Sequence, residues 1–287
     1  MQENPISGEL VLVATPIGNL GDLSPRALEY LRHADIIYCE DTRHSRTLLS
    51  ANAIPAARRL HALHEHNEVG ESARVVSRVA AGELVVLVSD AGTPGISDPG
   101  SRVVAAVIDA GLRVTTAPGP SAVIAALSVS GLSTERFVMD GFLGRKAGER
   151  SQRYDQWAAE ERTIVFYESP QRVSSVMGEL AILFPERRVA VARELTKLHE
   201  EVLRGTVVEV ARELAERSVL GEVVVVLEGA PVREPVSEDV VLAALEEQWG
   251  EGASTRDAVE YVSRILGVAH RDVYELALAS RKDARGD

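Results

Sequence analysis

The chain has 287 residues, of which 45% are hydrophobic and 26% are charged, a composition that is ordinary for a globular protein. Its 31 basic and 43 acidic residues give a formal net charge of −12, which argues against tight non-specific binding to bare nucleic acid but permits a local basic patch. Cys39 is the only cysteine, so an internal disulfide and a cysteine-based zinc site are both excluded.

The sequence carries no signal for a membrane or for export. No apolar run approaches the length that is needed to cross a bilayer, and the first ten residues, MQENPISGEL, lack the basic and apolar regions of a signal peptide. We therefore expect a cytoplasmic protein without a membrane partner.

The first half of the chain predicts a mainly parallel sheet. Five short strands are predicted, at residues 9–14, 36–39, 60–63, 85–88 and 113–117. Helical patterns lie between them: one starts at Ser24-Pro25, with proline at the first helical position, and an amphipathic one spans residues 72–81. The polar and Gly/Pro-rich segments that follow the strands, residues 40–45 among them, are expected as loops at one edge of the sheet.

The stretch from residue 85 to residue 100, VVLVSDAGTPGISDPG, contains the most informative of these loops. Three glycines and two prolines fall within nine residues, which excludes the interior of a helix or a strand. In an open α/β sheet, ligands bind beyond the carboxyl ends of the strands. We therefore expect the backbone of this loop to approach a ligand; the alternative is a tight turn between a strand and a helix.

The second half predicts a further alternation of strands and helices. Strands are predicted at residues 137–139, 163–167, 188–192 and 222–227, and a strand or a turn at residues 201–206. Helices are predicted through residues 173–180 and 207–214, and residues 141–146 are expected as a flexible basic loop.

A linker rich in proline and charge, residues 229–239, separates this part from the C-terminal segment. Three short helices are predicted there, at residues 240–249, 254–266 and 271–280. Gly267 lies in the tight connection between the last two, which is the outline of a helix-turn-helix; the alternative is a simple helical cap.

Several common functional motifs are absent. Gly18 and Gly21 supply only the last spacing of the dinucleotide fingerprint G-x-G-x-x-G, and neither a P-loop nor a G-x-S-x-G elbow is present. His61, His64 and His66 follow a weak strand, where a surface loop is commoner than a set of ligands, so no metal site is predicted. What remains is a pocket of Gly/Pro loops, which suits a cofactor held by shape and main-chain hydrogen bonds.

Eight segments carry a resemblance to a known family. In chain order they are TPIGNLGDLSPRA, EDTRHS, LHEHNE, SDAGTPGISDPG, APGPSA, FYESPQR, ARELTKLHEE and GEVVVVLEG. On these segments, which span residues 9 to about 230, the chain resembles the ribosomal RNA small-subunit methyltransferase I family. This family comprises cytidine 2′-O-methyltransferases of the tetrapyrrole methylase superfamily, and the C-terminal helices resemble the small helical tail found on such enzymes.

The resemblance implies an α/β fold of two α/β domains of the tetrapyrrole methylase type, with a cofactor cleft between them. The implied boundaries are an N-terminal domain at residues 1–118, a C-terminal domain at residues 119–232 and a helix-turn-helix-like tail at residues 233–287. The resemblance also implies S-adenosylmethionine as the cofactor, and we expect a homodimer.

By the same resemblance, the Gly-Asp-Pro loop of the superfamily corresponds here to Gly92-Thr93-Pro94. The residues expected to bind the cofactor are Asp90, Ala91, Gly92, Thr93, Ile96, Ser121, Ala122, Tyr167, Glu168, Leu195 and Gly229. Two segments depart from the family pattern. Gly144 stands where relatives often carry proline, and the loop after the first strand lacks the Gly-x-Gly-Pro-Gly of the tetrapyrrole enzymes, which favours a substrate other than a porphyrinoid.

Methyl transfer to a ribose hydroxyl needs close alignment and a group that orients the oxygen or removes its proton. Lys197, near Glu194 and Glu200, is the first candidate for this catalytic role, and Asp98 is the second. The acidic neighbours of Lys197 favour orientation over proton removal. The alternatives are that Lys197 only salt-bridges those neighbours and that Asp98 only caps the helix after the loop.

Contacts to RNA phosphates are predicted for Arg43, His44, Arg145 and Lys146; the alternative is that these are solvated loop charges. The expected substrate is the RNA of the small ribosomal subunit, presented as an assembled particle. Two other functions stay open at this point. One is a tetrapyrrole C-methyltransferase on the same fold, and the other is a non-catalytic nucleotide- or ribosome-binding module.

Overall fold

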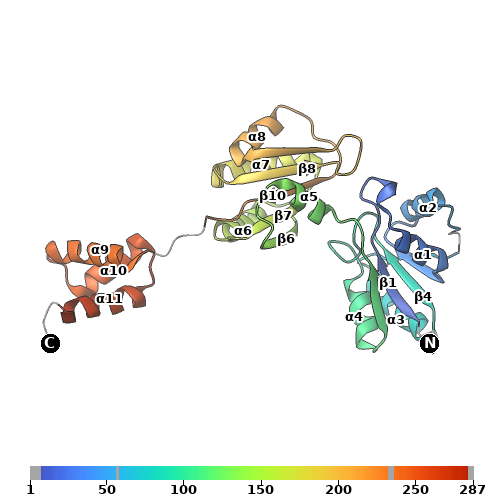
Figure 1. Ribbon diagram of the computed structural model, residues 1–287, viewed down its shortest axis with the longest axis horizontal. Coiled ribbons are helices and arrows are strands. Elements are labelled where there is room, and N and C mark those ends of the chain that lie inside the picture. Colours follow the sequence, from blue (N-terminus) through green and yellow to red (C-terminus); the bar gives the residue numbers. More distant parts are fainter. Residues whose placement is uncertain (1–7, 56–57, 232–235, 284–287) are drawn as a thin grey trace. The chain divides into compact units, whose positions relative to one another are not determined.

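The computed structural model describes residues 8–55, 58–231 and 236–283, and the chain divides into two compact units, Met1–Ala230 and Pro231–Asp287. The first unit holds two five-stranded sheets with flanking helices (Figure 1). A division of this unit at residue 118 stays a prediction, and the predicted boundary at residues 232 and 233 lies outside the described residues.

The first sheet is entirely parallel and has the strand order β3-β2-β4-β1-β5. Its strands are β1 (Glu9–Val13), β2 (Ile36–Cys39), β3 (Leu60–Ala62), β4 (Leu84–Val88) and β5 (Arg113–Ala117). Val13 pairs with both Val88 and Ala117, so the loops after β1, β4 and β5 leave the same edge of the sheet. This edge is where the sequence predicts a ligand.

Helices cover both faces of the first sheet (Figure 1). α1 (Pro25–His33) and α2 (Thr42–Ala51) pack on one face, and α3 (Glu68–Ala80) and α4 (Ser101–Asp109) pack on the other. The three inner strands β1, β2 and β4 are therefore buried on both sides, which explains why they consist of unbroken apolar runs, whereas the edge strands β3 and β5 are less buried and more polar.

The second sheet is mixed and has the strand order β6-β7-β10-β8-β9. Its strands are β6 (Phe137–Phe142), β7 (Thr163–Glu168), β8 (Arg188–Arg193), β9 (Glu201–Thr206) and β10 (Val223–Leu227). β6 and β7 are parallel, whereas the pairs that involve β10, β8 and β9 are antiparallel. The start of β10 therefore lies beside the carboxyl ends of β7 and β8, since Val223 pairs with Glu168 and Arg193.

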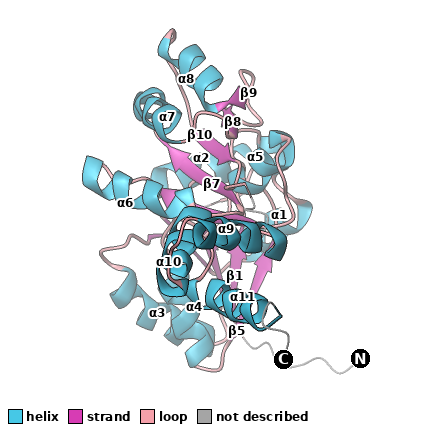
Figure 2. Cartoon of the chain, turned by 90° about the vertical axis from the view of Figure 1, so that its left-hand side faces the viewer, coloured by secondary structure: helices cyan, strands magenta, loops and turns pink. Residues whose placement is uncertain are grey.

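Helices also cover both faces of the second sheet (Figure 2). α6 (Ala147–Ala158), α7 (Pro170–Leu183) and α8 (Val207–Ala215) pack on one face, and α5 (Ala122–Ser130) packs on the other. Ile17, from the loop after β1, joins the apolar cluster under α5. This side chain connects the first sheet to the core of the second.

Three helices and one strand end differ from the prediction. No helix was predicted at residues 122–130, where α5 forms. Residues 40–45 were expected as a loop, but α2 begins at Thr42 because the Asp41 side chain accepts a hydrogen bond from the Arg43 amide at 2.8 Å and caps it. α6 was not predicted either. β6 continues to Phe142 through an irregularity after Met139, so the predicted short strand was wrong in length.

The second unit comprises, in its described part, α9 (Glu238–Gly250), α10 (Thr255–Leu266) and α11 (His270–Asp283) around a small apolar core. Gly267 ends α10 in a left-handed conformation with a φ of 65°, as the predicted helix, glycine turn and helix require. None of the helices in the described ranges combines the length and hydropathy that a membrane span needs.

Candidate active site

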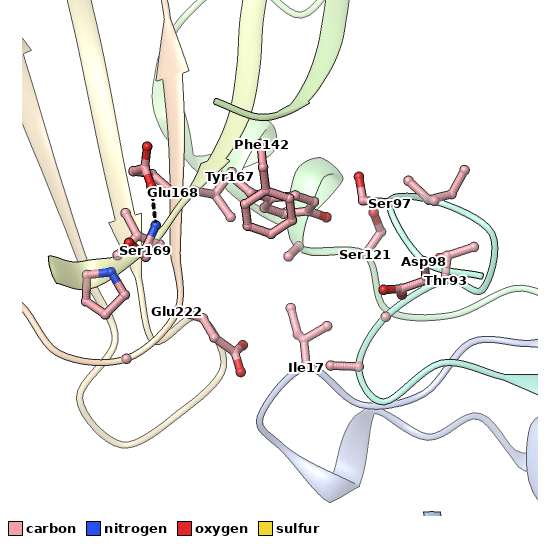
Figure 3. A pocket seen from close by; sticks show the side chains of 18 residues that line it. Ile17, Thr93, Ser97, Asp98, Ser121, Phe142, Tyr167, Glu168, Ser169 and Glu222 are labelled. Atoms are coloured by element: carbon pink, nitrogen blue, oxygen red, sulfur yellow. Dashed lines mark hydrogen bonds between the residues drawn. The ribbon is translucent and has the colours of Figure 1, made fainter. Parts of the chain in front are cut away.

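A cavity of about 290 Å³ lies where the ligand-facing edge of the first sheet meets the second sheet (Figure 3). The loop after β4 forms one wall, and the ends of β6 and β7 and the start of β10 form the opposite wall. We call it the first cavity. Its lining residues are Ile17, Ala91, Gly92, Thr93, Ile96, Ser97, Asp98, Ser121, Ala122, Phe142, Tyr167, Glu168, Ser169, Pro170, Gly221, Glu222, Val223 and Val224.

Backbone hydrogen bonds fix the loop after β4. The amide of Gly92 donates to the Thr15 carbonyl at 3.0 Å, and the amide of Thr15 donates to the Gly92 carbonyl at 2.9 Å. Gly92 has a φ of 85°, a conformation that glycine adopts readily and L residues rarely do. The Thr93 hydroxyl donates to the Pro120 carbonyl at 3.2 Å, which joins this loop to the one after β5. These contacts tie the loop after β4 to the loops after β1 and β5 and fix its place in the wall of the cavity.

Glu68, and not Asp98, caps the helix that follows the loop. The Glu68 side chain is buried, and its Oε1 accepts hydrogen bonds from the amides of Gly100 at 2.9 Å and Arg102 at 3.0 Å. The alternative that Asp98 caps α4 is therefore wrong. Its carboxylate instead lines the first cavity, as Figure 3 shows.

The environment of Asp98 suits proton transfer. Burial raises the pKa of its carboxyl to about 6, and the negative charges of Glu40 and Asp90 add to the shift. Asp98 also lines a polar cavity with Glu40, His64 and His66. A carboxylate with a pKa this close to neutrality can accept a proton and pass it to a polar exit.

The second-sheet wall of the first cavity is aromatic and acidic. The rings of Phe142 and Tyr167 lie with their centroids 5.1 Å apart and tilted by 37°. Glu168 is buried, and its Oε1 accepts the Ser169 amide at 2.7 Å. Its Oε2 lies 3.2 Å from the Arg172 guanidinium but accepts no hydrogen bond within the described part of the chain. The Glu168 carboxylate is therefore buried and held by Ser169 and Arg172.

A second cavity, of about 280 Å³, adjoins the first, because Ile17, Ala91 and Glu222 line both. Its further lining residues are Pro16, Gly18, Leu20, His44, Thr47, Leu48, Ala51, Asp90 and Lys197. Two adjoining cavities with a shared wall can hold two reactants in contact, which is the geometry that a group transfer requires.

Lys197 lies in the second cavity as a paired cation. Its Nζ donates to Glu194 Oε1 at 2.9 Å and lies 3.7 Å from Glu222 Oε1. Burial lowers the pKa of this ammonium, but the two carboxylates outweigh burial, so the net shift is upward. Glu200, which was expected beside it, instead accepts the Thr196 amide at 2.6 Å. Lys197 is therefore charged at neutral pH.

The loop that carries Lys197 is held in an uncommon backbone conformation. Glu194 and Thr196 have φ values of 50° and 66°, which cost about 1–3 kcal/mol each for residues other than glycine. Gly18, in the loop after β1, packs directly on this segment, and a Cβ there would lie 2.9 Å from the Thr196 hydroxyl oxygen. The close approach of these two loops sets the position of the lysine in the second cavity.

Comparison with known proteins shows the family of the chain. The family model described as Tetrapyrrole (Corrin/Porphyrin) Methylases matches residues 9–211. A relative from Xylella fastidiosa, named ribosomal RNA small subunit methyltransferase I, is 51% identical over 78% of this chain and 82% of its own. A relative of the same name from Synechocystis is 42% identical over 96% of this chain and 99% of its own. The chain belongs to the ribosomal RNA small subunit methyltransferase I family.

The fold is that of the superfamily. A crystal structure of uroporphyrin-III-C-methyltransferase from Thermus thermophilus matches with a TM-score of 0.53 over 76% of this chain and 94% of that chain. At 21% identity this match shows the fold alone. The fold class predicted from the sequence, two α/β parts with C-terminal helices, is confirmed, and the chain is a methyltransferase.

In this methyltransferase, most residues that the sequence singled out for a cofactor come together. Those that line the first cavity are Ala91, Gly92, Thr93, Ile96, Ser121, Ala122, Tyr167 and Glu168, and the catalytic candidate Asp98 lines it too. They come from loops that are far apart in the chain, so their convergence is a property of the fold.

Three of the predicted cofactor residues lie elsewhere. Asp90 lines the second cavity and not the first. Leu195 is 7% exposed and packs in the apolar cluster under α5. Gly229 follows the far end of β10, away from Val223, where a Cβ would collide with the Glu161 carbonyl. Gly229 is therefore separated from the first cavity by the length of β10, because only the first residues of this strand line the cavity.

Sequence reasoning missed Ile17, Phe142 and Glu222 as cavity residues. Ile17 lies in a segment that carries the family resemblance, and Phe142 lies within the predicted basic loop at residues 141–146. An isolated apolar residue in such a segment gives no signal of its role. Glu222 precedes the last strand, and only the antiparallel placement of β10 brings it to the shared wall of the two cavities.

The four predicted RNA contacts lie on two separate segments. Arg43 and His44 are in the first turn of α2, where Arg43 pairs with Asp41 at 2.7 Å and His44 lines the second cavity. Arg145 and Lys146 precede α6, and both are exposed. The two segments could contact RNA only at different points of its surface, and their role stays a prediction.

The histidine cluster has ordinary surroundings. The His61 ring lies 5.7 Å from the ring of Tyr38, and His64 and His66 line the polar cavity with Asp98. Within the described ranges, no group of three His, Cys, Asp or Glu side chains is arranged to hold a metal ion.

Proposed function

We propose that the protein transfers a methyl group from S-adenosylmethionine to the 2′-hydroxyl of a cytidine in small-subunit ribosomal RNA. The observation that carries this proposal is the identity of 42% to a relative named ribosomal RNA small subunit methyltransferase I over 96% of the chain. Two adjoining cavities, one for a donor and one for an acceptor, support it.

The first cavity suits the proposed cofactor. Its walls combine the apolar and aromatic surfaces of Ile96, Phe142 and Tyr167 with the main-chain groups of the Gly92 loop. The carboxylate of Asp98, which lines the same cavity, favours a positively charged sulfur. When bound, S-adenosylmethionine supplies an electrophilic methyl group.

The chain itself then has to align the ribose oxygen and take up its proton. Lys197, a cation in the second cavity, orients the oxygen and stabilises the negative charge that develops on it. Asp98 accepts the proton and releases it toward the polar cavity that it shares with Glu40 and the histidines. Proximity alone can lower the barrier by about 7–11 kcal/mol in well-aligned cases.

The other two functions have less support. The solved structures that act on porphyrinoids match at identities that show only the fold, and the loop after β1 lacks their glycine pattern. A non-catalytic module would not need a paired lysine and a carboxyl with a pKa of about 6 beside the same two cavities. A homodimer and a cytoplasmic location stay predictions.

The test is a map of ribose methylation on small-subunit RNA from cells with and without this protein. One ribose methyl group is expected to disappear in its absence and to return when purified protein and S-adenosylmethionine are added to subunits from the deficient cells. An unchanged map would contradict the proposal, and methylation of a porphyrinoid would favour the tetrapyrrole alternative.

Replacement of Gly92 by valine is expected to weaken S-adenosylmethionine binding at least tenfold. A β-branched residue is strained at the φ of 85° that Gly92 adopts, so the loop that lines the first cavity must shift. Calorimetric titration measures the effect. Gly70→Val, at a position with open space around it, is a matched control and is expected to bind normally. An unchanged affinity of the Gly92 variant would move the cofactor site elsewhere.

Assembled or partly assembled small subunits are expected to be methylated at least tenfold faster than naked small-subunit RNA. The net charge of −12 gives the protein little general affinity for RNA, and that affinity falls with salt. A particle adds protein and shape contacts. The measurement compares the two substrates at physiological salt, and equal rates would contradict the prediction.

A further inference from the structure

The second cavity has the composition of a site for a nucleobase. Leu20, Leu48 and Ala51 contribute apolar side chains to its lining, and Asp90 and His44 contribute polar ones. Flat apolar surfaces with a few directional polar groups are typical of sites that bind aromatic heterocycles. Because Lys197 and Glu222 lie in the same cavity at the wall shared with the first, a base bound here would have its ribose near the point of methyl transfer.

The orientation of Asp90 is fixed by a single contact. Its Oδ1 accepts the amide of Asp41, at the amino end of α2, at 3.0 Å. Within the described ranges, no protein donor takes its second oxygen. The carboxylate is thus anchored through one oxygen and can present the other to an occupant of the cavity. Glu40 and Asp98 interact electrostatically with Asp90, and this accumulated negative charge favours a hydrogen-bond donor over an acceptor at its free oxygen.

We propose that Asp90 reads the base of the acceptor nucleotide by accepting a hydrogen bond from the exocyclic amino group of cytosine. This inference rests on the proposed function and adds the specificity of its acceptor site. A carboxylate is the side chain that pairs with cytosine N4. Uracil carries a carbonyl oxygen at the same position. Both this oxygen and the Asp90 carboxylate are hydrogen-bond acceptors, so no hydrogen bond forms between them.

The anchored geometry predicts the effect of one isosteric change. In Asp90→Asn, the amide oxygen can keep the hydrogen bond from Asp41, which turns the NH₂ group toward the cavity. The NH₂ group donates to the uracil carbonyl and no longer accepts from cytosine. The variant is therefore expected to lose about ten- to a hundredfold in transfer to cytidine and to gain transfer to uridine.

The experiment uses small subunits reconstituted with either cytidine or uridine at the position mapped by the methylation assay. Single-turnover rates are measured for the wild type, Asp90→Asn and Asp90→Ala. The ratio of cytidine to uridine rates should be high in the wild type, fall at least tenfold in Asp90→Asn and approach one in Asp90→Ala. Thermal melting and S-adenosylmethionine titration verify that each variant is folded, since Asp90 does not line the first cavity.

Asp22→Asn is the matched control, because it removes the same charge from an exposed residue in the short helix Leu20–Asp22, beside the second cavity but not in its lining. Its cytidine-to-uridine ratio should equal that of the wild type. A wild-type ratio in folded Asp90→Asn would overturn base reading by Asp90 and leave the proposed function intact. If the wild-type protein methylates neither the cytidine nor the uridine substrate, both base reading by Asp90 and the proposed function would be overturned.

Discussion

Replacing Asp98 with asparagine is expected to lower methyl transfer about 10²- to 10⁴-fold, the usual contribution of a positioned proton acceptor. The amide keeps the shape of the side chain but cannot take up the hydroxyl proton. Burial and the charges of Glu40 and Asp90 raise the pKa of Asp98 to about 6, so it is ionised at neutral pH and is a stronger base than an ordinary carboxylate. Single-turnover transfer to small subunits at saturating cofactor measures the loss.

The pH dependence reports the same group independently. Asp98 accepts a proton only when ionised, so wild-type transfer should rise as the pH increases through about 6 and then level off. The Asp98→Asn variant should lack this limb. Asp109→Asn, at the exposed end of α4, is the matched control and should keep both rate and limb. If Asp98→Asn transfers the methyl group at the wild-type rate, or if its rate still rises through about pH 6, Asp98 is excluded as the proton acceptor.

The backbone part of the site could be predicted from the sequence because it is encoded locally. The Gly/Pro content of the loop after β4 excludes regular structure, and the apolar run before it fixes where the loop leaves the sheet. Parallel pairing then brings it beside the loops after β1 and β5, as Val13 with its two partners shows. Gly92 and Ser121 therefore meet as the pattern indicates.

The side-chain part depends on contacts between distant segments and could not be predicted. Nothing in the sequence near Glu68 indicates that its carboxylate caps a helix that begins 33 residues later. Because Glu68 caps this helix, the Asp98 side chain is not used as the cap and lines the cavity instead. Glu222 reaches the site only because β10 runs antiparallel between β7 and β8. Gly229 gives the opposite case. It is close in sequence to residues of the site, but it follows the end of β10 that is far from the cavity.

Replacing Lys197 with alanine is expected to lower turnover about 10²- to 10³-fold, the typical cost of losing one group that stabilises charge in the transition state. Affinity for S-adenosylmethionine should stay normal, because Lys197 lines the second cavity and not the first. Its paired carboxylates, Glu194 and Glu222, hold its pKa above the ordinary value, so it acts as a cation and adds no limb to the pH profile near neutrality. Rapid-quench turnover and calorimetric titration separate the two effects.

Two further variants distinguish this role from a structural ion pair. Lys197→Arg keeps the charge and should recover part of the turnover, whereas a surface ion-pair partner would be replaceable by alanine at a cost of about 1 kcal/mol or less in stability and none in rate. Lys146→Ala removes an exposed lysine outside both cavities and should change the KM for subunits more than kcat, since its predicted partner is an RNA phosphate. Near-normal turnover in Lys197→Ala would reduce the lysine to a surface ion-pair partner. Alignment of the ribose oxygen would then depend on Glu222 and the shared wall of the two cavities.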